Sequence, residues 1–118
     1  MKLVHLNIFE LDREKNENCH HGDGVIEMCR VLNQNDFISN CNFVDYAIIP
    51  PGCSIGIHKH GNNEEFYLIL EGNGIMTVDY QQFNVKKGDL ILNRPGGEHG
   101  LINNSKKVLK IFVIEINC

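Results

Sequence analysis

The chain has 118 residues, of which 42% are apolar and 22% charged, a balance typical of a soluble globular protein. This length suits a single domain with one modest core and leaves no room for a second catalytic module. The formal net charge of −4 argues against nucleic acid or an anionic membrane surface as a partner. The N-terminus lacks the apolar core of a signal peptide, and no apolar run approaches the length of a membrane span, so we expect a cytoplasmic protein.

Short apolar or alternating runs follow one another along the chain and are separated by turn-forming residues. They predict strands at residues 4–11, 24–32, 42–49, 54–60, 65–71, 74–80, 89–92, 99–103 and 108–116. Residues 36–39 are expected to form a short turn or helical piece. Many short strands without a long helical periodicity predict an all-β fold that closes into a jelly-roll barrel.

The cysteines are odd in number and include no Cys-x-x-Cys pair. They are Cys19, Cys29, Cys41, Cys53 and Cys118. This pattern suits reduced thiols better than a disulfide framework, in keeping with the cytoplasmic location expected above.

Three histidines and a glutamate have spacings that would let them surround one metal ion. His58 and His60 fall in a predicted strand, where alternate side chains share a face, so both imidazoles can reach the same ion. The turn-like residues 61–63 then reverse the chain and bring a carboxylate, that of Glu64 or Glu65, to the same point. After a Pro-Gly-Gly turn, His99 offers a fourth ligand.

The first of these clusters resembles a sequence motif of the cupin family. The family has glycine, five residues, His-x-His, three or four residues, glutamate, six residues and glycine. The matching residues here are Gly52, His58, His60, Glu65 and Gly72. Only Glu65 keeps the six-residue gap to Gly72, so the resemblance selects Glu65 over Glu64.

The family's second motif matches at Gly88, Gly96, His99 and Asn103. Arg94 stands where cupins usually have proline, and Pro95 follows one residue later. Because the distance from Gly88 to His99 is kept, we expect a reshaped turn and an unchanged ligand position.

The resemblance implies one cupin domain, a double-stranded β-helix, over residues 1–118, with N-terminal strands and a loop in residues 1–49 and the barrel with both motifs in residues 50–118. It also implies that one divalent transition metal ion is held by His58, His60, Glu65 and His99. Imidazole and carboxylate ligands suit Fe, Mn, Ni, Co, Zn or Cu. Four protein ligands leave positions open on an ion that prefers six, and a small molecule or water can occupy them.

Cupins with this ligand set include dioxygenases, decarboxylases and isomerases. The resemblance therefore implies a metal-dependent enzyme that acts on a small oxygenated or carboxylate-bearing molecule. The alternative is a non-catalytic module that uses the metal to bind or sense a small ligand. Single-domain cupins commonly pair through N-terminal strands, so the strand predicted at residues 4–11 implies a homodimer.

Four further residues are candidates for catalytic roles. Strand parity places Tyr67 inside the barrel with Glu65, where its hydroxyl could bind a ligand oxygen or only complete the packing. Arg94 could clamp a substrate carboxylate or be a solvated turn arginine. The segment 19–24 is either an exposed loop or a lid whose His20 or His21 acts as a general acid or base. Adjacent histidines in an extended chain point to opposite faces, so both cannot easily join one metal.

Overall fold

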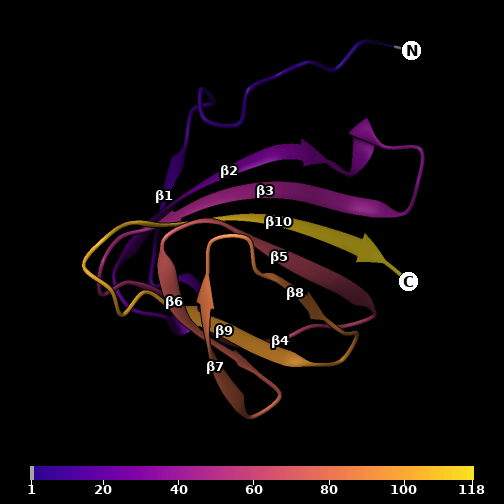
Figure 1. The fold of residues 1–118 in the computed structure, drawn as a ribbon. Coiled ribbons are helices and arrows are strands. Elements are labelled where there is room, and N and C mark those ends of the chain that lie inside the picture. Colours follow the sequence, from indigo (N-terminus) through magenta and orange to yellow (C-terminus); the bar gives the residue numbers. More distant parts are fainter. Residues whose placement is uncertain (1) are drawn as a thin grey trace.

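The computed structural model describes residues 2–118, which form strands and two short 3-10 helices in the order shown in Figure 1. The strands are β1 (Glu14–Glu17), β2 (Val25–Asn33), β3 (Cys41–Ile49), β4 (Ser54–Lys59), β5 (Asn63–Glu71), β6 (Asn73–Val78), β7 (Gln81–Lys86), β8 (Leu90–Asn93), β9 (Glu98–Ile102) and β10 (Leu109–Asn117). The helices are η1 (Cys19–His21) and η2 (Gln34–Asp36). Within residues 2–118, no helix has the length and apolar character needed to cross a membrane.

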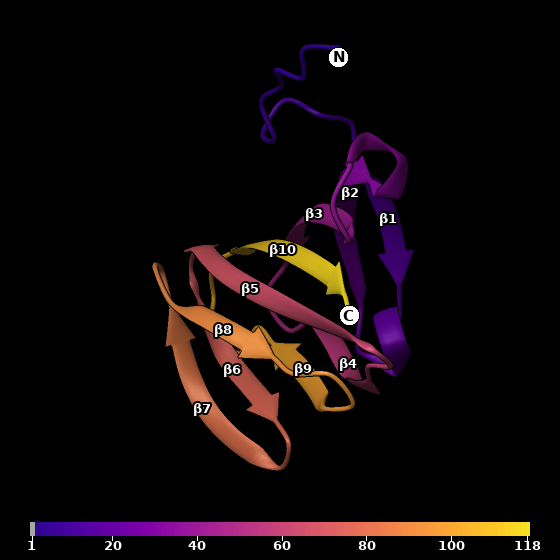
Figure 2. The same cartoon turned by 90° about the vertical axis from the view of Figure 1, so that its right-hand side faces the viewer.

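The strands form two antiparallel sheets. The first has six strands in the order β1-β2-β3-β10-β5-β8, and the second has four in the order β4-β9-β6-β7. Figures 1 and 2 show the two sheets facing each other around a common interior. The prediction of an all-β fold of jelly-roll type is confirmed.

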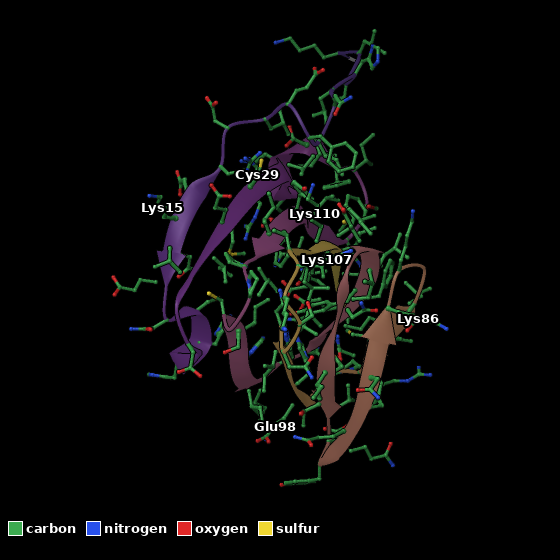
Figure 3. All side chains as sticks on the ribbon, turned by 60° about the vertical axis from the view of Figure 1, so that its left-hand side comes forward. Lys15, Cys29, Lys86, Glu98, Lys107 and Lys110 are labelled. Carbon is green, nitrogen blue, oxygen red and sulfur yellow. The ribbon has the colours of Figure 1, made fainter. Side chains whose placement is uncertain are left out.

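The core fills the space between the sheets, because successive side chains of a strand point to opposite faces and those that point inward are mostly apolar. On β10, for example, Leu109, Ile111 and Val113 are buried while the residues between them are partly exposed. Figure 3, which draws every side chain, shows this interior filled. The largest core side chains come from both sheets and include Ile26, Ile49, Tyr67, Ile69, Met76, Leu101, Leu109 and Ile111.

The strand predicted at residues 4–11 is wrong, because this segment is irregular or turn-like in the structure. It runs away from the barrel in Figures 1 and 2, and Leu3, Val4 and Phe9 are largely exposed. Its residues have strand propensity, but a strand forms only where a neighbouring strand completes its hydrogen bonds. The Phe9 ring of this segment meets Tyr46 of the barrel edge-on, with centroids 5.5 Å apart.

Two strands were missed by the sequence analysis, and both lie at the edge of a sheet. β1 has the sequence Glu-Lys-Asn-Glu, and four of the six residues of β7 are polar. Edge strands carry polar residues because one side of their backbone faces solvent, which hides the alternating pattern of a buried strand. The helical piece expected at residues 36–39 begins earlier, as η2, where the Asn33 side chain accepts a hydrogen bond from Asn35 N at 3.1 Å.

Candidate metal centre

The structure brings together the four residues that the two sequence motifs single out as metal ligands. His58 lies near the end of β4, His60 directly follows β4, Glu65 lies on β5 and His99 on β9. Each offers a ligand atom, and these atoms all lie within 4.8 Å of one another. Three separate strands therefore deliver one compact donor cluster that could hold a metal ion.

Local backbone geometry explains how the two motifs meet at this point. The pairing of β4 with β9 shifts register between Ile55 and His58, and beyond this irregularity His58 lies directly opposite His99. The turn after β8 packs against the end of β4, since His60 N donates to Gly97 O at 2.9 Å. The Pro-Gly-Gly turn, shifted by the unusual Arg94, thus still fixes the two motifs against each other.

Hydrogen bonds orient two of the imidazoles. His58 Nδ1 lies 2.7 Å from Gly56 O, and His60 Nδ1 lies 2.9 Å from Asn63 Oδ1. Both partners are acceptors, so each Nδ1 carries a proton and Nε2 is left as the ring nitrogen that can bind a metal. Metal-binding histidines are commonly fixed in this way by a second partner.

Glu65 is the charged centre of the cluster. Its Oε1 lies 3.1 Å from His99 Nε2 and 3.4 Å from His60 Nε2. Burial by itself raises the pKa of Glu65, but the hydrogen bonds from His60 and His99 outweigh it and lower the pKa to about 2. The carboxylate is therefore ionised at neutral pH, as a metal ligand must be.

The histidines titrate differently because their surroundings differ. Desolvation lowers the pKa of His58 to about 4, which keeps this ring neutral and able to bind a metal. The hydrogen bond to Glu65 raises the pKa of His60 above its usual value. A metal at this site would replace a proton on His60.

The donor set fits a divalent transition metal. His60 Nε2 is buried and, apart from the long contact with Glu65 Oε1 at 3.4 Å, has no hydrogen-bond partner within residues 2–118. Buried nitrogens without partners are costly, and a bound ion would satisfy such a nitrogen. Three imidazoles packed within about 5 Å around one carboxylate match the nitrogen and oxygen preference of borderline divalent ions.

A cavity of about 380 Å³ opens beside the cluster. One part of its wall is apolar and includes Met28, Phe43, Ala47, Ile55, Ile111 and Val113. The polar part includes His20, Arg30, Asp45, His58, His60, Glu65, Tyr67 and Glu115. Metal ligands and apolar walls thus share one cavity that can hold a small molecule.

The four residues predicted to assist catalysis lie in different places. Tyr67 is buried in the cavity wall, with its ring edge-on to His99 at 5.2 Å. Burial and the nearby charge of Glu65 raise its pKa well above the usual value, so the hydroxyl keeps its proton. Arg94 is exposed in the turn between β8 and β9 and does not line this cavity.

His20 and His21 both lie in η1 and are both exposed. The His20 ring stacks on the His58 ring with centroids 3.7 Å apart. The segment is fastened to β4, because Ser54 N donates to Asp23 O at 2.9 Å and Asp23 N donates to Ser54 Oγ at 2.8 Å. His20 therefore covers one metal-ligand candidate from the cavity side, and it is held there by backbone contacts.

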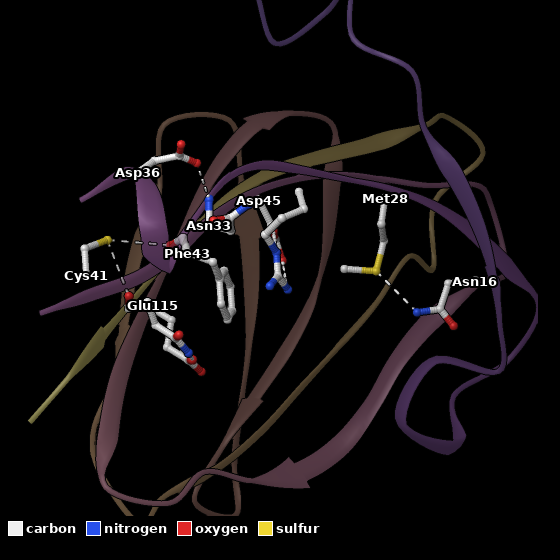
Figure 4. Close-up of polar contacts among 10 residues, drawn as sticks. Asn16, Met28, Asn33, Asp36, Cys41, Phe43, Asp45 and Glu115 are labelled. Atoms are coloured by element: carbon white, nitrogen blue, oxygen red, sulfur yellow. Dashed lines mark hydrogen bonds and ion pairs between the residues drawn. The ribbon is translucent and has the colours of Figure 1, made fainter. Parts of the chain in front are cut away.

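Sequence reasoning missed two acidic groups that face the cavity. Glu115 on β10 is buried, places Oε1 3.3 Å from His60 Nδ1, and accepts a hydrogen bond from Asn42 Nδ2. Asp45 on β3 is also buried and is paired with Arg30 (Figure 4). The sequence does contain a signal for Glu115. Alternate residues of a strand point to the same face, so Glu115 is expected to point inward like Leu109, Ile111 and Val113.

Asn103, the asparagine of the second motif, has a role in the fold. Its Nδ2 donates to Ile49 O and to Lys107 O, both at 2.8 Å, and its Oδ1 accepts from Ser105 N at 3.0 Å. The side chain thus fixes the loop between β9 and β10, away from the donor cluster.

Comparison with known proteins gives consistent results. The chain is 48% identical over 110 residues, 93% of this chain and 87% of the other, to an uncharacterised protein of Methanocaldococcus jannaschii. It is 28% identical to an oxalate-binding protein of Thermotoga maritima, covering 91% of this chain and 88% of that protein. The crystal structure of a predicted oxalate decarboxylase from Thermotoga maritima superposes with a TM-score of 0.94 and 26% identity, covering 98% of this chain and all of that one.

A family model described as a cupin domain matches residues 45–115. This range runs from β3 to β10 and contains both motifs and all four members of the donor cluster. Because the match covers more than half of the chain and agrees with its sheets, this chain belongs to the cupin family.

Proposed function

We propose that this cupin holds one divalent transition metal ion at His58, His60, Glu65 and His99 and uses it to bind and convert a small carboxylate-bearing molecule. The observation that carries the proposal is the convergence of four ligand atoms within 4.8 Å at the wall of a cavity. Such an ion supplies Lewis-acid chemistry to a bound carboxylate or carbonyl.

The substrate class is supported by chemistry and by similarity. Oxygen anions bind well to hard and borderline divalent ions through open coordination positions. A sequence relative from Thermotoga maritima is described as an oxalate-binding protein, and a similar crystal structure from the same organism is described as a predicted oxalate decarboxylase. Among the reaction classes found in this family, decarboxylation of a small carboxylate is therefore the one we propose first, and oxygen-dependent cleavage and isomerisation follow.

The chain's own residues contribute binding and shielding. The Tyr67 hydroxyl keeps its proton and can donate to a ligand oxygen beside His99. His20 stacks on His58 and closes that side of the cluster to water. The apolar wall around Ala47 and Ile111 excludes solvent from the remaining part of the cavity and strengthens the electrostatic interactions there.

A second candidate function is binding without conversion, and the description of one relative as an oxalate-binding protein favours it. The same metal and cavity would serve both functions. The two functions differ only in whether the bound carboxylate is converted or is released unchanged.

The test begins with metal analysis of protein purified without chelator, where we expect one ion per chain. Glu65→Gln should lose most of the metal because the variant removes the charged ligand, while Glu64→Gln should retain it, since strand parity points Glu64 away from the cluster. Equal metal loss in both variants would show that Glu65 is not the ligand.

Turnover is then followed with metal-loaded protein and oxalate, by release of carbon dioxide with and without oxygen. Release of carbon dioxide together with formate and without net consumption of oxygen supports a decarboxylase, and release that consumes oxygen supports oxygen-dependent cleavage. Tight metal-dependent binding without release supports the binding module. If metal-free protein binds oxalate as tightly as loaded protein, the proposed function is wrong.

A further inference from the structure

The cavity contains a second charged group that is separate from the metal-ligand candidates. Arg30 on β2 donates from Nε to Asp45 Oδ1 at 2.6 Å and from Nη2 to Asp45 Oδ2 at 3.3 Å. Its guanidinium carbon lies 4.1 Å above the centre of the Phe43 ring. Figure 4 shows Phe43 with Asp45 on one side and Glu115 on the other.

These contacts orient the guanidinium without using all of its donors. Arginine has five N–H groups, and Asp45 accepts from two of them. Within residues 2–118, Arg30 makes no other side-chain hydrogen bond, and its side chain is 52% exposed at the cavity wall. Arg30 therefore presents free donors to the cavity from a fixed position.

Stability alone does not explain this pair. Asp45 is only 4% exposed, and taking a carboxylate out of water costs free energy that a partner roughly returns. On the same strand, inward neighbours such as Ala47 and Phe43 are apolar, so an apolar residue would also fit at position 45. A buried carboxylate that holds an arginine at a cavity wall is better explained by recognition of an anion.

Arg30 and the metal cluster line the same cavity but lie on different strands. Glu65 and Phe43 lie on β5 and β3, which both pair with β10, so their backbones are about 10 Å apart. Because the Arg30 guanidinium lies over Phe43, a ligand that contacts both Arg30 and the cluster has to reach across the intervening strand β10. Oxalate, whose two carboxyl carbons are joined by one bond of about 1.5 Å, is the shortest dicarboxylate, and a carbon spacer lengthens the reach of the second carboxylate.

We propose that the ligand of this site is a dicarboxylate with a carbon spacer, which places one carboxylate at the metal cluster and the other on Arg30. This inference rests on the metal-dependent carboxylate function proposed above. Planar bidentate pairing with a carboxylate is the recognition for which arginine is suited. A cavity of about 380 Å³ has room for such a molecule, with its spacer against the apolar wall.

The test is calorimetric titration of metal-loaded protein with oxalate, malonate, succinate and glutarate, and with butyrate and valerate as length-matched monocarboxylates. Succinate or glutarate should bind about tenfold or more tightly than its monocarboxylate, the effect of one charged hydrogen bond. Arg30→Met should remove this preference and weaken oxalate binding much less. Arg13→Met is the matched control, because Arg13 pairs with Glu27 at 3.6 Å and does not line the cavity.

Arg30→Met leaves Asp45 buried without its partner and could destabilise the fold, so the double variant Arg30→Met with Asp45→Asn is titrated in parallel. If the double variant also loses the preference for dicarboxylates over monocarboxylates, the result supports binding of the second carboxylate by Arg30. The inference is overturned if oxalate binds in a metal-dependent way while the longer dicarboxylates bind no more tightly than butyrate and valerate, or if the preference persists without Arg30. If no carboxylate binds more tightly to loaded than to metal-free protein, the proposed function itself fails.

Discussion

At the scale of single residues, Glu65 decides the electrostatics of the site. It is the only member of the cluster that carries a formal negative charge, and two histidine nitrogens lie within 3.4 Å of its Oε1. Glu115 adds a second carboxylate on the far side of His60. His60, which Glu65 contacts, and His58, which it does not, therefore respond to pH in opposite ways.

This contrast gives a pH prediction for metal-free protein. The pKa of His58 is lowered to about 4, so acidification from about pH 6.5 charges His58 in the unfolded chain first and destabilises the folded state. The pKa of His60 is raised, so its contribution stabilises the folded state below about pH 6.5 and is lost as the pH rises through its folded pKa.

Thermal melting of chelator-treated protein between about pH 7 and pH 5 tests this. The stability of His58→Gln should fall less on acidification than that of the wild type, and the stability of His60→Gln should fall more. The same pH dependence in both variants would contradict the assigned environments of the two rings.

At the scale of structural elements, the approach of η1 to β4 positions His20 over His58. Gly56 makes this approach possible, because a Cβ built there would lie 2.0 Å from His20 O and 2.8 Å from Gly22 N. Both neighbours are backbone atoms, so they cannot move aside without displacing η1.

Gly56→Ala should therefore destabilise the protein by about 2 kcal/mol or more and weaken metal binding, since His58 is two residues away and bonds to Gly56 O. Gly61→Ala is the matched control, because a Cβ at position 61 would meet nothing within 4 Å. Chemical denaturation and metal titration of both variants check this. A Gly56→Ala variant as stable as Gly61→Ala would show that η1 does not pack closely on β4.

Most of the elements could be predicted from the sequence because buried strands alternate their side chains and turns use glycine and proline. The donor cluster could also be predicted from the sequence. His58 and His60 are alternate residues of a predicted strand that share a face, and one turn brings Glu65 back to them. The edge strands β1 and β7 escaped prediction, because their solvent-facing residues are polar. The ion pair of Arg30 with Asp45 joins residues fifteen apart on neighbouring strands, and only the register of β2 and β3 reveals it.

At the scale of the whole molecule, the N-terminal segment remains without a partner strand. Leu3, Val4, Leu6 and Phe9 are exposed to between 38% and 88%, an unusual set of apolar side chains for one short segment. We propose that a second copy of the chain covers them in a two-fold dimer.

Light scattering at micromolar concentration should give a mass close to twice 13.4 kDa. A variant with Leu3→Ser, Val4→Ser and Leu6→Ser should shift the equilibrium towards the monomer, because these substitutions remove the apolar surface that drives association. A monomeric wild-type protein would rule out this proposal and leave the metal centre unaffected.

The apolar core of the barrel and the metal centre are separate sets of residues. The core contains apolar side chains from both sheets and does not include the donor cluster, so we expect the fold to form without an ion. His99 belongs to the cluster and is fully buried, yet its replacement removes only one of four ligands.

The most direct test of the account is the metal content of folded His99→Ala, measured beside the wild type after purification without chelator. Circular dichroism of the same sample establishes that the variant is folded. We expect one ion per wild-type chain and little or no metal in a variant that keeps its β structure. A folded variant that remains fully loaded would show that His99 is not a ligand and would contradict the metal centre described here.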